Sequence, residues 1–101
     1  MKQLTYQQGD VLFYRVDSLP LETQNKPDGI VAHGEATGHF HAIQGGKVFE
    51  GVEGVLFVDA PEGAIAIHQE HDPIHIGPGM FEIGIVREYD HFAEEARKVV
   101  D

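Results

Sequence analysis

Residues 55–69, VLFVDAPEGAIAIHQ, hold two short apolar runs on either side of a turn, and they decide the fold class. VLFVD (55–59) is built from β-branched, aromatic and aliphatic residues. AIAIHQ (64–69) follows after the segment APEG (60–63), which contains both proline and glycine. Apolar runs of four to eight residues bounded by such breakers are typical of β-strands. The stretch therefore predicts two strands joined by a turn.

The same pattern repeats on both sides of this stretch. The predicted strands are residues 10–16, 29–33, 39–44, 47–54 (a short strand and a turn), 74–76 and 80–90. Gly45 and Gly46 predict a tight hairpin, because two glycines tolerate the positive φ that hairpin turns require. Residues 17–29 are polar, contain two prolines and are expected to form a loop. Seven to nine short strands without a helix between them predict an all-β fold, a small antiparallel β-barrel or sandwich over residues 10–90.

The final segment, HFAEEARKVV at 91–100, predicts one C-terminal helix. Its acidic residues come first and its basic residues last, an order that complements the helix dipole. Phe92, Ala96 and the two valines share one side, so the helix is expected to dock on the sheet or on a partner. The whole chain, 1–101, is then a single domain, because a chain of this length supports one core.

Composition excludes several classes of function. The formal net charge of −10, from 17 acidic and 7 basic residues, disfavours nucleic acid as a partner. The absence of cysteine excludes disulfides, thiolate metal ligands and cysteine nucleophiles. No stretch reaches the roughly 20 apolar residues of a membrane span, and the N-terminus does not resemble a signal peptide. We therefore expect a cytoplasmic protein with no membrane partner.

Two histidines lie one residue apart in GEATGHFHAI (34–43). Alternate residues of a strand share a face, so His39 and His41 are expected to point the same way and to reach one ion. A second cluster, AIAIHQEHDPIH (64–75), carries His68 and His71 where the strand is expected to end. Ala64 and Ala66 share the face of His68, and their small size favours a pocket wall there.

Together, His39, His41, His68 and His71 predict a site for a divalent transition metal. Imidazole nitrogen is a common ligand of zinc, which we expect first, and also of iron, manganese and nickel. The alternative is that these rings only hydrogen-bond backbone carbonyls, as histidines on half-buried strands often do. That alternative is preferred for His33 and His91, and His75 is left open between the two.

Two acidic residues are candidates for acid–base catalysis beside such a metal. Glu35 precedes His39 by four residues, across a turn. Glu82 lies on the last long strand with Gly84 beside it, so its side chain can enter a pocket. Glu82 is the preferred candidate.

The histidine pattern resembles the cupin superfamily of small β-barrels. The resemblance rests on Gly38-His39-Phe40-His41 and on HDPIHIGPGMFEI (71–83), and it covers residues 30–86. It implies a metal-binding barrel with His39 and His41 as ligands. The chain departs from the cupin pattern at Gly45 and Gly46, where a glutamate is usual. The chain also resembles a group of small bacterial and phage-encoded proteins that share GExTGHxH and HxEH, which implies no activity.

Three functions remain open from the sequence. The leading hypothesis is a small metal-binding β-barrel whose ion acts on a small-molecule substrate. The second is a non-catalytic protein with a closed structural zinc site, which binds a partner or forms a homodimer through its terminal helix. The third is a metal-free module that binds a small molecule, with histidines as hydrogen-bond donors.

Overall fold

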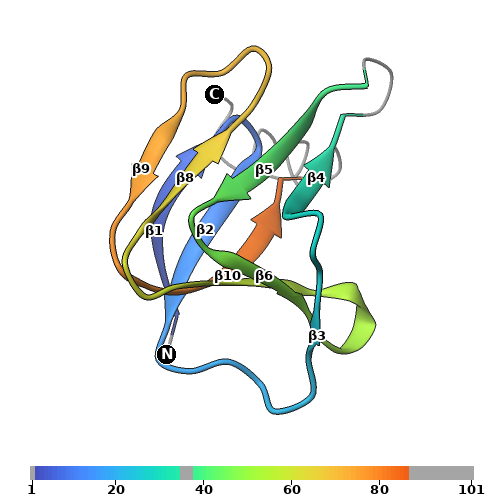
Figure 1. Cartoon of the computed structure of the whole chain (residues 1–101), viewed down its shortest axis with the longest axis vertical. Helices are drawn as coiled ribbons and strands as arrows, with labels where there is room; N and C mark the ends of the chain where they lie inside the picture. The colour runs from blue at the N-terminus through green and yellow to red at the C-terminus, as the bar shows by residue number, and fades with distance from the viewer. Residues whose placement is uncertain (1, 35–37, 87–101) are drawn as a thin grey trace, which may run out of the picture.

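The strands of the protein form two antiparallel β-sheets, as a computed structural model of residues 2–34 and 38–86 shows (Figure 1). The all-β prediction is therefore confirmed. The strands are β1 (Gln3–Gln8), β2 (Val11–Val16), β3 (Gln24–Asn25), β4 (Ile30–His33), β5 (Phe40–Gln44), β6 (Lys47–Glu50), β7 (Leu56–Ala60), β8 (Ala64–Ile67), β9 (Ile74–Ile76) and β10 (Gly79–Ile85). A short 3-10 turn, η1 (Val52–Gly54), connects β6 and β7.

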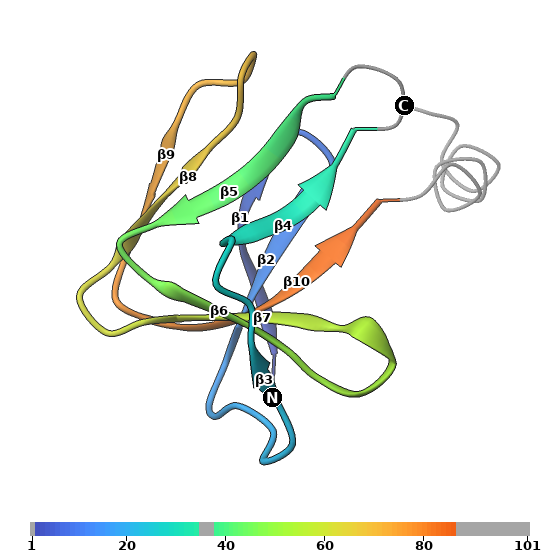
Figure 2. The same ribbon diagram turned by 45° about the vertical axis from the view of Figure 1, so that its right-hand side comes forward.

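One sheet has six strands in the order β1-β2-β10-β7-β6-β3, and the other has four in the order β4-β5-β8-β9. Successive antiparallel pairs alternate between the sheets: β4 pairs with β5 in the smaller one, β6 with β7 in the larger one, and β8 with β9 in the smaller one. The chain thus crosses repeatedly from one sheet to the other (Figure 2). Of the two predicted architectures, the described strands form two open sheets and not one closed barrel.

Several predicted elements differ from the structure. Gly45 and Gly46 do not close a hairpin, because β5 and β6 belong to different sheets. A β-carbon at Gly46 would lie only 3.1 Å from the carbonyl oxygen of Asp59, so this position carries the chain close past β7. Strand β1 was not predicted, and β3 lies in the predicted loop. The predicted helix at 91–100 lies outside the described residues. No helix within 2–34 and 38–86 is long and apolar enough to cross a membrane.

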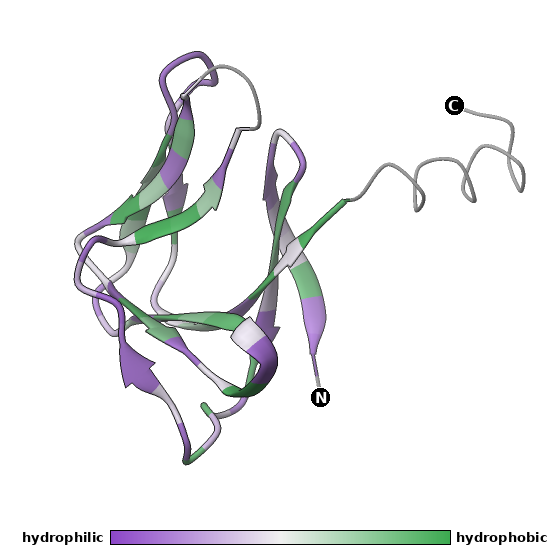
Figure 3. Cartoon of the chain, turned by 90° about the vertical axis from the view of Figure 1, so that its right-hand side faces the viewer, coloured by the Kyte–Doolittle hydropathy of each residue, from purple (hydrophilic) through white to green (hydrophobic). Residues whose placement is uncertain are grey.

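The hydrophobic core lies between the two sheets. Phe13, Val58 and Phe81 from the larger sheet are fully buried, and Ile43 and Ala66 from the smaller sheet belong to the same cluster. The rings of Phe13 and Phe81 meet edge to face at 6.4 Å. Hydrophobic and hydrophilic residues alternate along the strands, which gives each sheet one face for the core (Figure 3).

One end of this core carries the histidines. His41 is two residues before buried Ile43 on β5, and His68 is two residues after buried Ala66 on β8, so both imidazoles continue the core-facing rows of their strands. Ala64 and Ala66 are 8% and 1% exposed and pack in the core. Ala64 also lines a hollow together with Glu62 and His75, but His68 is not among the residues of that hollow, so the alanines do not form the predicted pocket wall beside His68.

Candidate metal centre

Three histidines from the smaller sheet and its β8–β9 loop meet at this end of the core. One ligand nitrogen from each of His41, His68 and His71 lies within 4.8 Å of the others. The ring centroids of His41 and His68 are 4.3 Å apart, and those of His68 and His71 are 4.6 Å apart. His41 is buried, His68 is half-buried and His71 is exposed. The arrangement can hold a metal ion with one side toward the core and the other toward solvent.

A buried glutamine from the other sheet contacts the deepest of these rings. Gln8, at the end of β1, is 3% exposed, and its Oε1 lies 2.9 Å from Nδ1 of His41. Its Nε2 donates to the carbonyl oxygens of Ala66 at 3.0 Å and Asp72 at 2.9 Å. Because only the amide NH2 can donate to two carbonyls, the amide has one orientation and its Oε1 must accept from His41. Neutral His41 therefore carries its proton on Nδ1, and the lone pair of Nε2 is available.

His68 has the opposite hydrogen-bonding pattern. Its Nδ1 accepts hydrogen bonds from the backbone N–H of Glu70 at 3.0 Å and of His71 at 3.2 Å. A protonated Nδ1 has no lone pair left to accept these hydrogen bonds. The neutral ring of His68 therefore carries its proton on Nε2. These bonds also define the tight turn that brings His71 back beside His68.

The β1–β2 turn forms another wall of the site. Gly9 has φ of +59°, and a β-carbon there would lie 2.7 Å from Nε2 of His71 and 3.4 Å from Cε1 of His41. The next residue, Asp10, is near enough for its carboxylate to favour the protonated forms of His41 and His68. Figures 1 and 2 show this turn and the β8–β9 loop at the same end of the molecule.

Burial and mutual repulsion keep two of the rings neutral. Burial lowers the pKa of His41 below its ordinary value of 6.5, and the neighbouring imidazoles of His68 and His71 lower it further. The pKa of His68 is also lowered, first by desolvation and then by the imidazoles of His71 and His39. Neutral imidazole is the form that binds metal. Near neutral pH, these rings are therefore in the state that a metal requires.

The fourth predicted ligand, His39, lies at the edge of the cluster. Its ring meets that of His68 edge-on with centroids 5.6 Å apart, and its Nδ1 lies 3.7 Å from Oε2 of Glu70. The adjacent backbone N–H of Phe40 donates to Oε1 of Gln69 at 2.8 Å, which ties the start of β5 to the turn after β8. The structure thus places His39 beside the triad, against the outer side of His68.

Glu82, His75 and His33, which the structure describes, do not belong to the triad. Glu82 lies between buried Phe81 and Ile83 on β10, so its side chain is on the opposite face from the core, where its Oε2 pairs with Nζ of Lys2 at 3.1 Å. His75 is exposed on β9, and His33 is exposed on β4, where its ring lies near that of Phe40. The candidates Glu35 and His91 lie outside the described residues.

Sequence analysis missed Gln8, Gly9 and Asp10. The segment QQGD (7–10) had a visible turn signal in Gly9-Asp10, because glycine followed by a polar residue is common in hairpin turns. Nothing local indicated that this turn would contact histidines more than 30 residues away along the chain.

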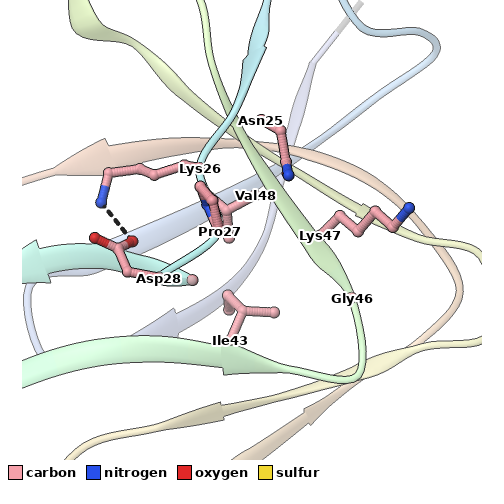
Figure 4. Close-up of a pocket in the computed structure, with 9 residues that line it drawn as sticks. Asn25, Lys26, Pro27, Asp28, Ile43, Gly46, Lys47 and Val48 are labelled. Atoms are coloured by element: carbon pink, nitrogen blue, oxygen red, sulfur yellow. Dashed lines mark hydrogen bonds and ion pairs between the residues drawn. The ribbon is translucent and has the colours of Figure 1, made fainter.

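A hollow whose lining contains no histidine lies beside β3, β5 and β6. This pocket of about 300 Å³ is lined by residues of 25–29, Ile43 and 46–48, including two lysines (Figure 4). Nζ of Lys26 donates to Oδ1 of Asp28 at 2.8 Å and to the carbonyl oxygen of Ile30. The side chain of Lys47 points away from Lys26. The two ammonium groups therefore do not converge on a ligand.

Comparison with known proteins places the chain in a family without assigning it an activity. Residues 7–86 match the family described as "Domain of unknown function (DUF8820)", and the chain belongs to this family. The matched region runs from the residue before Gln8 to the residue after β10, so it contains the whole histidine triad. No curated protein and no solved structure matches the chain. The resemblance to cupins stays a prediction.

Proposed function

We propose that this protein binds one divalent transition metal ion through His41, His68 and His71, with zinc the first candidate. The observation that carries the proposal is the convergence of three imidazole nitrogens within 4.8 Å of one another. Zn–N bonds of 2.0–2.1 Å in a tetrahedral site place ligand nitrogens about 3.4 Å apart. With the ligand nitrogens no more than 4.8 Å apart, each distance is at most about 1.4 Å longer than that spacing.

The surroundings of the triad favour a metal over three ordinary histidines. The buried ring, His41, keeps its Nε2 lone pair because its proton is on Nδ1, which donates a hydrogen bond to Oε1 of Gln8. A metal-bound histidine commonly has such a partner on its other nitrogen. The cluster also brings three basic groups together in a protein of net charge −10, whose field attracts cations.

Three protein ligands leave a fourth tetrahedral position open. His71 is exposed, so this position faces solvent and can take water or a small ligand. A zinc ion with three histidine ligands lowers the pKa of its bound water to about 7 and polarises carbonyl or phosphoryl oxygens. We therefore propose that a small-molecule substrate, if the protein is an enzyme, binds at this outer position.

A closed structural site is the second candidate, and the position of His39 favours it. Its ring already contacts His68, and a fourth nitrogen would complete the four-coordinate arrangement of structural zinc. In that case the protein acts through a bound partner or as a homodimer, and the metal stabilises the fold. A His39→Ala variant separates the two: an open three-histidine site keeps its metal, and a four-histidine site loses affinity.

Elemental analysis of tag-free protein, purified without added metal or chelator, tests the proposal. We expect about one equivalent of a transition metal in the wild type and in His75→Ala, whose exposed ring lies on β9 outside the triad. We expect none in His41→Ala. Retention of a full equivalent by His41→Ala, or no uptake of Zn²⁺ or Co²⁺ by the wild type on titration, would overturn the assignment.

A further inference from the structure

Gln8 hydrogen-bonds to His41 on β5 and to the segment 66–72, which carries His68 and His71. Its Oε1 faces Nδ1 of His41 on β5, and its Nε2 donates to Ala66 on β8 and to Asp72 in the β8–β9 loop. All three contacts lie between 2.9 and 3.0 Å, and the side chain is 3% exposed. The side-chain amide of Gln8, from the six-stranded sheet, thus hydrogen-bonds to β5 and β8 of the four-stranded sheet and to the β8–β9 loop.

The two carbonyls that Gln8 holds flank the turn that carries the other ligands. Ala66 precedes His68 by two residues, and Asp72 follows His71 directly. Holding both carbonyls fixes the two ends of the segment 66–72, and the bonds to Nδ1 of His68 fix its middle. The distance between the imidazoles of His68 and His71 therefore depends on Gln8, although the hydrogen bonds of Gln8 go to neither ring.

The same amide selects the tautomer of the third ring. With both N–H groups directed at carbonyls, the amide offers only an oxygen to His41, and His41 must donate from Nδ1. The lone pair then stands on Nε2. A water molecule in the place of Gln8 can donate or accept, so it would not make this selection.

We propose that Gln8 is the positioning residue of the three-histidine site. It holds His41 in the tautomer that presents Nε2 and fixes the ends of the turn that bears His68 and His71. This inference rests on the proposed metal-binding function for its purpose. The tautomer of His41 and the geometry of the turn at 66–72 can both be measured in protein without bound metal.

The first test is the nitrogen NMR spectrum of the histidine side chains in metal-free wild-type protein at neutral pH. The expected pattern is a proton on Nδ1 of His41. A proton on Nε2 of His41, or rapid exchange between the two tautomers, would overturn the inference without any variant.

Two substitutions separate the two roles. Gln8→Met fills the space with no hydrogen-bonding group, so we expect a mixture of His41 tautomers and a Co²⁺ affinity about 10- to 100-fold weaker, the usual effect of losing such a partner. Gln8→Glu keeps an acceptor for Nδ1–H and loses the donors to Ala66 and Asp72. His41 should keep its proton on Nδ1 in this variant, while the resonances of residues 68–72 shift and Co²⁺ binds with intermediate affinity.

Gln3→Met is the matched control, because Gln3 is the same residue type on the same strand and is exposed. It should bind Co²⁺ like the wild type. If Gln8→Met has the same His41 tautomer and the same Co²⁺ affinity as Gln3→Met, Gln8 is not a positioning residue. If Gln8→Met does not fold, Gln8→Glu is compared with Gln3→Met instead, through the resonances of residues 68–72. If the wild type binds no Co²⁺ or Zn²⁺, the proposed function fails, and the tautomer measurement still decides the role of Gln8.

Discussion

Gly9 lies directly against the imidazole of His71: a β-carbon at position 9 would stand 2.7 Å from His71 Nε2. The contact joins the β1–β2 turn of the larger sheet to the β8–β9 loop of the smaller one. The turn can approach this closely because glycine has no side chain, and its φ of +59° is a conformation that glycine adopts without strain.

We expect Gly9→Ala to weaken metal binding by more than about tenfold, because the added methyl group pushes His71 away from the other two ligands. The left-handed backbone also costs about 1–2 kcal/mol of folding stability for an alanine. Titration with Co²⁺ measures the first effect and chemical denaturation measures the second.

Gly54→Ala is the control that separates these two effects. Gly54 has φ of +78°, but the atom nearest to its added β-carbon is Oε2 of Glu50 at 3.8 Å, an ordinary contact. Gly54→Ala should lose about as much folding stability as Gly9→Ala and keep the metal affinity of the wild type. Equal affinities for Gly9→Ala and Gly54→Ala would show that His71 is not a ligand or can move freely.

Glu82→Gln should leave metal binding unchanged. The Glu82 carboxylate pairs with Lys2 on the outer face of the larger sheet, and this pair is partly exposed, with side-chain exposures of 26% for Glu82 and 50% for Lys2. Pairs of this kind contribute less than about 1 kcal/mol, so the variant should also be nearly as stable as the wild type. A clear loss of metal affinity, measured by the same Co²⁺ titration, would place Glu82 in the site after all.

The sequence was informative wherever the signal was local. Short apolar runs bounded by the Pro- and Gly-containing segment 60–63 identified the strands of 55–69, because such runs and their breakers can be read from neighbouring residues alone. For the same reason, the HxH spacing predicted that His39 and His41 share a face, whereas His71 reaches His68 through the turn after β8. Glu82 could have been placed correctly too, since Phe81 and Ile83 on either side of it are the apolar residues of that strand and direct it away from the core.

The remaining features depend on contacts between distant segments. Gly45-Gly46 permits a turn, but the local sequence does not show that β6 crosses to the other sheet, where it pairs with β7 and buries Val48 in the core. The β1 sequence QLTYQQ is mostly polar because this strand is at the edge of its sheet, with one neighbour and an exposed face. Gln8 looks like any polar residue until the sheets pack and bring His41 to it.

The stability of the metal-free protein should fall as the pH is lowered through 6.5. The pKa of His41 in the folded protein is below 6.5, mainly because the ring is buried, whereas the unfolded chain titrates near 6.5. Between these two values the unfolded state binds more protons, so protonation favours unfolding; below the folded pKa the loss levels off. His68, whose pKa is also lowered, adds to the effect.

Urea denaturation between pH 8 and pH 5, with a chelator present, measures this dependence. His41→Gln removes the titrating group and keeps a polar side chain, so its stability should vary less with pH in this window. A wild-type profile as flat as that of His41→Gln would mean that His41 is not held neutral by burial.

Metal binding should also rearrange the turn after β8. In the structure, Nδ1 of His68 accepts hydrogen bonds from the backbone N–H groups of Glu70 and His71. A metal on Nδ1 takes the lone pair that accepts these bonds, and a metal on Nε2 of a neutral ring moves the proton to Nδ1. Both routes remove the acceptor, so we expect the amide resonances of Glu70 and His71 to shift and their hydrogen exchange to accelerate on addition of Zn²⁺.

The amide of Phe40, which donates to Gln69, is an internal reference that depends less directly on the ring. Unchanged amides at Glu70 and His71 in a zinc-loaded sample would exclude His68 as a ligand and leave His41 and His71 to bind with His39.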